Sequence, residues 1–208
     1  MPRSFLSIVF LIAVAGSAMA QKQPTAEAIA AAGTFNGQEY SNSILGFSML
    51  APGGWTFYNA EQNQAAVERN KQVTAQMRDA KLISSAANTQ VLFQAIPPKF
   101  GGQNEQAILS AGIERLTTSI SLEDYAAVQS GHFAGSKSAR IVRDTYKITY
   151  GSVPFIGFDI EGLRNEGAYR QRYLMTIRHG VAVFVVATFF DDRQEAIVDA
   201  SLKSIKFK

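Results

Sequence analysis

Hydrophobic and polar residues alternate with a period of two along much of the last third of the sequence. This alternation is typical of β-strands that bury one face against a core. The run from Val181 to Phe190 differs, because apolar residues occupy both of its faces, and it predicts a central strand that is covered on both sides. The alternating pattern predicts strands over 139–150, 156–161 and 169–178, with turns at Asn165-Glu166-Gly167 and His179-Gly180.

Shorter strands are predicted earlier in the chain. Two lie between Glu39 and Leu50, and another runs from Gln90 to Ile96 and ends at Pro97-Pro98, because proline cannot donate to a strand ladder. Residues 107–116 alternate imperfectly, so that a strand and a helix both remain open for this segment.

The turn Pro52-Gly53-Gly54 raises a separate question, because the only tryptophan of the chain follows it directly. Pro52 ends a strand, and the two glycines allow a sharp change of direction. Trp55 and Phe57 then lie two positions apart, on one face of an extended segment. We expect both rings to cover the edge of the core.

Three segments begin like helices, with an N-cap residue and a polar partner three positions later. The pairs are Asn59 with Gln62, Ser121 with Asp124, and Asp192 with Glu195. The first helix, expected over Glu61 to Leu82, is so polar that we expect it to stay solvated, and a partner-binding helix is the alternative. Inward-facing positions are predicted at Leu122, Tyr125 and Val128 in the second helix and at Ile197, Val198, Leu202 and Ile205 in the third.

The first twenty residues have the pattern of an export signal. Arg3 precedes a short apolar run, and Ala18-Met19-Ala20 fits a signal-peptidase site. The run is shorter than the roughly 20 apolar residues of a membrane span, although a short membrane anchor is the alternative. We expect a cleaved signal over 1–20, a flexible leader (or a frayed helix) over 21–37, and a single α+β domain over 38–208. The protein is then periplasmic or secreted, without a stable membrane span.

Charge and composition exclude several classes of function. The formal net charge is +3, which falls to +2 when Arg3 leaves with the signal, and no run of Lys and Arg forms a nucleic-acid footprint. The chain has no cysteine, which excludes thiol nucleophiles, thiolate zinc sites and iron–sulfur clusters. Because disulfides are also excluded, the core must supply the stability.

The sequence offers little acid–base or metal chemistry. Its two histidines, His132 and His179, have no metal-ligand spacing to each other or to a carboxylate motif. A hydrolase triad could be assembled from Ser121, Asp124 and His132, but no Gly-x-Ser-x-Gly motif supports it. We therefore expect no catalytic, cofactor-binding or metal-binding residues, and no cofactor.

Arginines cluster on one of the predicted strands and form the candidate interaction surface. This surface comprises Arg164, Arg170, Arg172 and Arg178. The last three are separated by even numbers of residues, and their side chains therefore point to the same face of the strand. Folding the hairpin at Glu166-Gly167 is expected to place Glu161 opposite Arg172, with Asp159 diagonal to it. Two interpretations follow: a salt-bridged outer face of the sheet, or a surface for an anion or an acidic partner.

Short motifs along the chain resemble a known family. They are Tyr40-Ser41-Asn42, Leu45 to Ser48, Pro52 to Trp55, and the C-terminal spacing of Leu202, Ile205 and Phe207. Their order is similar to that of the Mog1/PsbP-like fold family, which includes many small exported bacterial proteins of unknown role. The resemblance implies an α+β fold with a largely antiparallel sheet flanked by helices. It also implies that Trp55 belongs to the fold, and that the protein binds or assembles and is not an enzyme.

Three functional hypotheses remain at this stage. The first is a non-enzymatic module that interacts with another protein of the cell envelope. The second is a carrier of a small apolar ligand, with a cavity lined by Tyr146, Phe158 and Tyr173. The third, with the least support, is a hydrolase. No nucleic-acid partner is expected.

The export signal makes a direct prediction. The native protein should begin at Gln21, because signal peptidase cuts after the small residue Ala20. Intact-mass measurement of protein purified from its natural source checks this. A mass that still includes residues 1–20 would contradict it.

Overall fold

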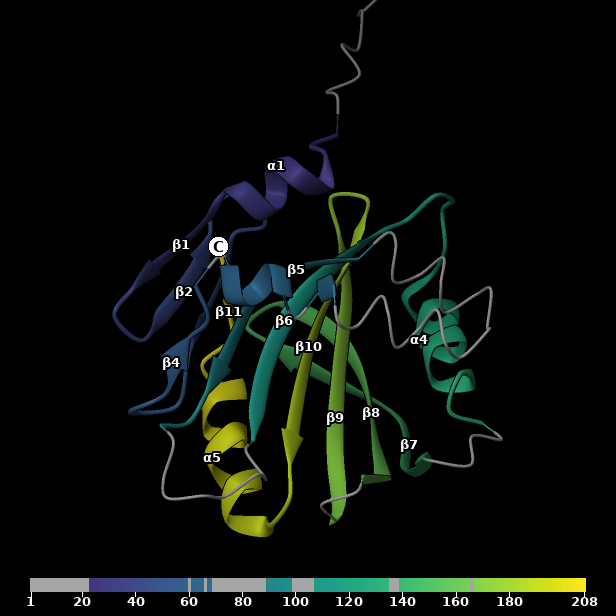
Figure 1. Ribbon diagram of the computed structural model, residues 1–208. Helices are drawn as coiled ribbons and strands as arrows, with labels where there is room; N and C mark the ends of the chain where they lie inside the picture. The colour runs from purple at the N-terminus through teal and green to yellow at the C-terminus, as the bar shows by residue number, and fades with distance from the viewer. Residues whose placement is uncertain are drawn as a thin grey trace, which may run out of the picture.

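The computed structural model shows two antiparallel sheets with helices packed on them (Figure 1). The residues that it describes are 23–59, 61–65, 67–68, 89–98, 107–134, 139–164 and 167–208. In this part of the chain, one sheet has seven strands and the other has four. The architecture is α+β, and the predicted fold class is confirmed.

The large sheet has the order β4-β5-β6-β10-β9-β8-β7, and each neighbouring pair is antiparallel. Its strands are β4 (Thr56–Phe57), β5 (Thr89–Ile96), β6 (Ile108–Arg115), β7 (Ala139–Tyr150), β8 (Val153–Arg164), β9 (Gly167–Arg178) and β10 (Val181–Phe189). Strand β10 is the central strand, as its apolar pattern predicted. The segment 107–116, which the pattern left open, is a strand, because β6 pairs with β5 on one side and β10 on the other.

The small sheet joins segments from both ends of the described chain. Its order is β1-β2-β3-β11. The strands are β1 (Gly33–Asn36), β2 (Glu39–Asn42), β3 (Phe47–Leu50) and β11 (Lys206–Phe207). Strand β11 pairs with β3, with Phe207 opposite Phe47. The two short strands predicted between Glu39 and Leu50 are thus confirmed as β2 and β3.

The large sheet is the middle layer of the protein (Figure 1). One face packs on α1 (Ala26–Ala31), α5 (Asp192–Leu202) and the small sheet, through a core that includes Tyr40, Phe47, Phe155, Val185 and Val198. The other face packs on α4 (Leu122–Gly131), through a second core that includes Tyr125, Phe158 and Ala182. The two faces of β10 therefore belong to two different cores.

The predicted helix caps are largely confirmed. Asn59 and Gln62 exchange two hydrogen bonds of 2.8 and 2.9 Å, although only 61–65 and 67–68 of the expected helix to residue 82 are described. The Ser121 hydroxyl accepts from the Asp124 N–H at 3.0 Å and caps α4. The cap of α5 was predicted one residue too late, because Asp191 accepts from the N–H of the residue at the third helical position, at 2.7 Å.

Two predicted inward positions are wrong. Val128 and Ile197 are exposed, at 50% and 38%. In α4 the buried stripe contains Tyr125 and Ala126, and Val128 points away because it lies about 200° further round the helix than Ala126. In α5 Val198 is fully buried, and its neighbour Ile197 is displaced by about 100°.

The expected flexible leader over 21–37 is also corrected. Its described part forms helix α1 and strand β1. Thr25 caps the helix, and Ile29 is completely buried in the core. The Asn42 side chain donates to the Ile29 carbonyl at 2.6 Å. This burial and hydrogen bonding offset the entropy of ordering the segment, which composition alone did not indicate.

The Pro52-Gly53-Gly54 turn places Trp55 as predicted. Gly54 has a φ of +80°, and the Trp55 N–H donates to the Pro52 carbonyl at 3.0 Å, which closes the turn. Trp55 is 6% exposed and belongs to the core under the small sheet. Its carbonyl accepts from the Gln38 side chain at 3.1 Å. Trp55 therefore stabilises the junction of the two sheets.

We predict that Trp55→Ala lowers the free energy of unfolding by about 3–5 kcal/mol, because it leaves a large cavity in the core. Urea unfolding, followed by circular dichroism, measures this loss. The control is Val128→Ala at an exposed apolar position, for which a change below about 0.5 kcal/mol is expected. Equal midpoints for the two variants would show that Trp55 is not a core residue.

Candidate functional site

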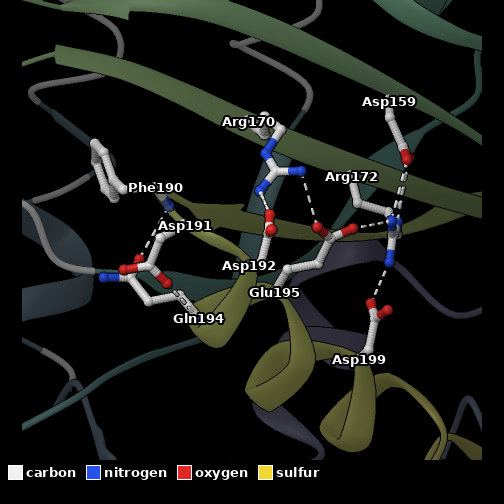
Figure 2. A network of polar contacts seen from close by, with 9 residues as sticks. All are labelled: Asp159, Arg170, Arg172, Phe190, Asp191, Asp192, Gln194, Glu195 and Asp199. Carbon is white, nitrogen blue, oxygen red and sulfur yellow. Dashed lines mark hydrogen bonds and ion pairs between the residues drawn. The ribbon is translucent and has the colours of Figure 1, made fainter.

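Two of the predicted site residues, Arg170 and Arg172, lie side by side on β9 and face helix α5 (Figure 2). Arg170, Arg172 and Leu174 follow each other at every second position of β9, so that they lie on the same face of the large sheet. Leu174 is in the core beneath α5. The arginine side chains are therefore enclosed between the sheet and a helix.

Arg172 is the centre of the network that Figure 2 shows. Its guanidinium contacts Asp159 at 3.1 Å and Glu195 at 2.9 Å, and it also bonds Asp199. Asp159 comes from the neighbouring strand β8, whereas Glu195 and Asp199 come from α5. Only 12% of the Arg172 side chain is exposed. The network thus connects β8, β9 and α5 through one cation.

Arg170 extends the network toward the beginning of α5. It pairs with Asp192 at 2.7 Å and with Glu195 at 2.9 Å, so that Glu195 bridges the two arginines. Its guanidinium also lies over the ring of Phe189, at 5.0 Å from the ring centre. Asp192 is almost fully exposed. The Arg170 end is therefore open to solvent, and the Arg172 end is not.

The strand register differs from the prediction by two residues. Asp159 lies directly opposite Arg172, and Glu161 lies opposite Arg170. The difference arises because Gly167 is already paired in the ladder, with Arg164, so that only two residues connect the strands. This register brings the carboxylate of Asp159 to the buried arginine.

The electrostatics of the network favour fixed charges. Burial alone would lower the pKa of Arg172, but the bonds and charges of Asp159 and Asp199 raise that pKa above its ordinary value. Burial also raises the pKa of Tyr146, whose hydroxyl donates to Asp159 at 3.2 Å. Arg172 stays protonated and Tyr146 stays neutral at physiological pH. The arrangement stabilises the packing of α5 and leaves neither group available for proton transfer.

The predicted arginine surface is therefore corrected. Arg172 is enclosed between β9 and α5, whereas the Arg170 side chain is 32% exposed at the open end of the network, and both arginines pair with carboxylates of α5. Arg178 is about 20 Å further along β9, where its guanidinium lies 5.0 Å from the ring centre of Phe207. Arg164 is in β8, and its side chain is outside the described part. The structure brings together two of the four arginines.

The hydrolase triad, which no sequence motif supported, does not assemble in the structure. Ser121 and Asp124 begin α4, whereas His132 ends it, about 15 Å away along the helix axis. Within the described ranges, no group of three or more His, Asp or Glu side chains could hold a metal ion. Among the described helices, none is long and apolar enough to cross a membrane.

The expected ligand cavity is also wrong. Phe158 and Tyr173 stack on each other, with ring centres 4.8 Å apart, in the core beneath α4. Tyr146 packs against the core on the opposite side of the sheet. The three side chains cannot line one cavity, because the large sheet separates them.

A different hollow, which the sequence did not indicate, lies at the β4–β5 edge of the large sheet. Its volume is about 820 Å³, within the usual range for ligand pockets. Phe35, which is 48% exposed, and Phe57 form an aromatic pair at one side, with ring centres 4.8 Å apart. The other described lining residues are Tyr58, Asn59, Asn63, Gln64, Val67, Thr89, Gln90, Val91 and Leu92.

The described lining of the hollow is polar but carries no charged side chain. None of its described lining residues is Asp, Glu, His, Lys or Arg, and four of them carry carboxamides. The Asn63 side chain donates to the Tyr58 carbonyl at 3.3 Å, but its own carbonyl oxygen is buried without a hydrogen-bond partner. An unpaired buried acceptor is costly, so that this oxygen marks a place where a donor would be stabilising. Of the lining residues, Phe57 and Asn59 had been singled out from the sequence for other roles, and Phe35, two positions before the turn residue Gly37, is a further signal that the sequence offered.

Known structures identify the fold. The cyanobacterial PsbP protein CyanoP from Synechocystis sp. PCC 6803 superimposes with a TM-score of 0.53 and 14% identity, over 85% of this chain and 98% of that chain. The chain has a Mog1/PsbP-like fold. At this identity the likeness concerns the fold alone.

Two further structures align less closely. LpqN, involved in cell envelope biogenesis of Mycobacterium tuberculosis, aligns at 12% identity and a TM-score of 0.48, over 76% of this chain and 79% of that one. PA94 from Pseudomonas aeruginosa, a protein of unknown function and putative regulator, aligns at 11% identity and a TM-score of 0.48, over 58% of this chain and 83% of that one. No protein-family model and no curated protein matches the sequence.

We predict that Arg172→Ala lowers the free energy of unfolding by about 3–5 kcal/mol, because it leaves the carboxylate of Asp159 buried without its cation. The control is Arg140→Ala. Arg140 also pairs with a carboxylate, that of Glu161, but its side chain is 76% exposed, so that a loss within about 1 kcal/mol is expected. Urea unfolding of both variants checks this, and a stable Arg172→Ala protein would restore Arg172 as a candidate for partner binding.

Proposed function

We propose that the protein is an exported, non-catalytic binding module of the cell envelope, and that another envelope protein docks at the β4–β5 hollow. The observation that carries this proposal is the hollow itself, which has an exposed phenylalanine at its rim and no charged residue in the described part of its lining. Export is supported by the signal pattern of the first twenty residues.

The chemistry of the lining supports binding over catalysis. General acid–base and nucleophilic catalysis need titratable groups within reach of the substrate. The described lining offers carboxamides, aromatic rings and aliphatic side chains, which hold a ligand by hydrogen bonds and apolar contact. The arginine–carboxylate network beneath α5 lies in another part of the protein and is already satisfied internally.

The form of the hollow supports a protein partner over a small apolar ligand. A pocket for an apolar ligand buries most of the ligand against hydrophobic walls, whereas about half of the described lining residues here are polar. Exposed Phe35 beside carboxamides has the composition of an interface, in which an aromatic residue is surrounded by polar groups.

Site-specific cross-linking in intact cells tests this proposal. Phe35 is replaced by the photoreactive p-benzoyl-phenylalanine, and the control carries it at Leu163, which is 71% exposed on β8, near the other edge of the large sheet. We expect a discrete adduct with one envelope protein from position 35 that is absent from position 163. Identical adducts from both positions, or an adduct of small-molecule mass from position 35, would contradict docking of a protein at the hollow.

A further inference from the structure

Strand β4 covers only part of the edge of β5. Its residues Thr56 and Phe57 pair with Ile96 and Ala95, and the Tyr58 N–H donates to the Gln94 carbonyl at 2.8 Å. Strand β5 starts much earlier, at residue 89. Among the described elements, no strand lies beside residues 90–93 on the side opposite β6. This stretch of the β5 edge, which has no partner among the described strands, is called the open edge below.

The hollow lies along this open edge. Gln90, Val91 and Leu92 line it, and Phe35 and Phe57 lie among its other walls. In an antiparallel strand, successive residues direct their main-chain N–H and C=O groups to alternate sides. Among the described strands only β6 pairs with 90–93, so that the main-chain groups directed to the other side of this stretch lie along the hollow.

The β5–β6 ladder is irregular at the same place. Val91 pairs with Gly112 and Phe93 with Ala111, so that Leu92 is an extra residue in the strand. Such bulges bend a strand and are frequent at sheet edges and beside functional sites. The irregularity lies within the part of β5 that β4 does not pair with.

We propose that an extended, uncharged peptide segment of the partner adds to the open edge of β5 as a strand, continuing the line of β4. The segment places an apolar side chain against Phe35 and Phe57, and it lies beside the carboxamide of Asn63. This inference rests on the proposed function, because it names the part of the partner that docks. A peptide fits this edge better than a saccharide or a lipid does, because only a peptide has main-chain groups spaced to form a strand ladder.

The absence of charge in the described lining defines the composition of the segment. A charged side chain pointing into the hollow would lose water without meeting an opposite charge, which is unfavourable. The carboxamides of Asn59 and Gln64 can both donate and accept, so that they suit neutral polar side chains such as Ser and Thr. The expected segment alternates apolar residues with neutral polar ones.

Titration of the purified, isotope-labelled protein with a defined peptide tests this inference by NMR. The probe is acetyl-Thr-Val-Ser-Phe-Thr-Val-amide. We expect saturable shifts of the backbone amides of 90–94, and at least about tenfold weaker binding of the same peptide after N-methylation of its inner residues, which removes the ladder hydrogen bonds. A version with Asp and Lys in place of the polar residues should also bind more weakly.

Matched variants locate the site. Phe35→Ser and Asn63→Ala should each weaken binding of the neutral peptide about tenfold. Leu163→Ser, which removes an even more exposed apolar side chain elsewhere, should leave binding unchanged. Urea midpoints of all three variants verify that each is folded. Phe35 and Asn63 are tested separately, so that misfolding of one variant leaves the other informative.

Three results would overturn strand addition: no shifts at 90–94, equal binding of the N-methylated peptide, or the same shifts with chitotetraose or dodecanoate as the probe. If the cross-link from position 35 to an envelope protein persists in any of these cases, docking at the hollow stands and only its mode is wrong. If the peptide binds as expected but no envelope protein is cross-linked, the edge accepts peptides and the proposed cellular role fails.

Discussion

Strand β10 has to be shielded from water on both of its faces, and the rest of the architecture follows from this requirement. Removing apolar surface from water is the main favourable term in folding. Val183 and Val185 on one face, and Ala182 on the other, are completely buried. One covering layer consists of the small sheet with α1 and α5, and the other contains α4. A three-layer α+β protein results from a central strand without a polar face.

The Arg172 network lies at the polar margin of one of these cores, and its role is to orient α5. Removing ions from water is expensive, and a buried ion pair is often no more stable than a well-packed apolar substitute. Three carboxylates from two elements nevertheless converge on one guanidinium with its fork of donors. Because a shift of α5 along or around its axis would separate these partners, we interpret the network as one that specifies the position of the helix.

The sequence predicted the features that depend on local pattern. The strands after residue 139, the central place of β10, the Asn59 and Ser121 caps and the burial of Trp55 were all correctly inferred, because alternation, capping and turn chemistry act over a few residues. The sequence did not predict the features that depend on contacts between distant segments. The segment around Ile29 is ordered by a hydrogen bond from Asn42 and by burial in the core. The arginines of β9 were expected on a surface, because neither segment alone indicates that α5 packs against β9.

The candidate site was missed for the same reason. The hollow combines Phe35 from β1, Phe57 from β4, a helical segment around residue 63 and the first half of β5. Each of these segments is unremarkable alone. What makes them a site is that β4 is shorter than the strand beside it, and strand length and register are set by the whole sheet.

The pairing of β11 with β3 has a consequence for the order of folding. Phe207 packs beside Phe47, and the Lys208 N–H donates to the carbonyl of Gly46 at 2.9 Å, where a side chain in place of glycine would clash. These contacts join segments that are far apart in the sequence, and such contacts form slowly because a long loop must close first. A chain that is synthesised from its N-terminus exposes β3 long before β11 is available. During this interval the edge of β3 that β11 later covers is unpaired, and the smaller sheet is still incomplete.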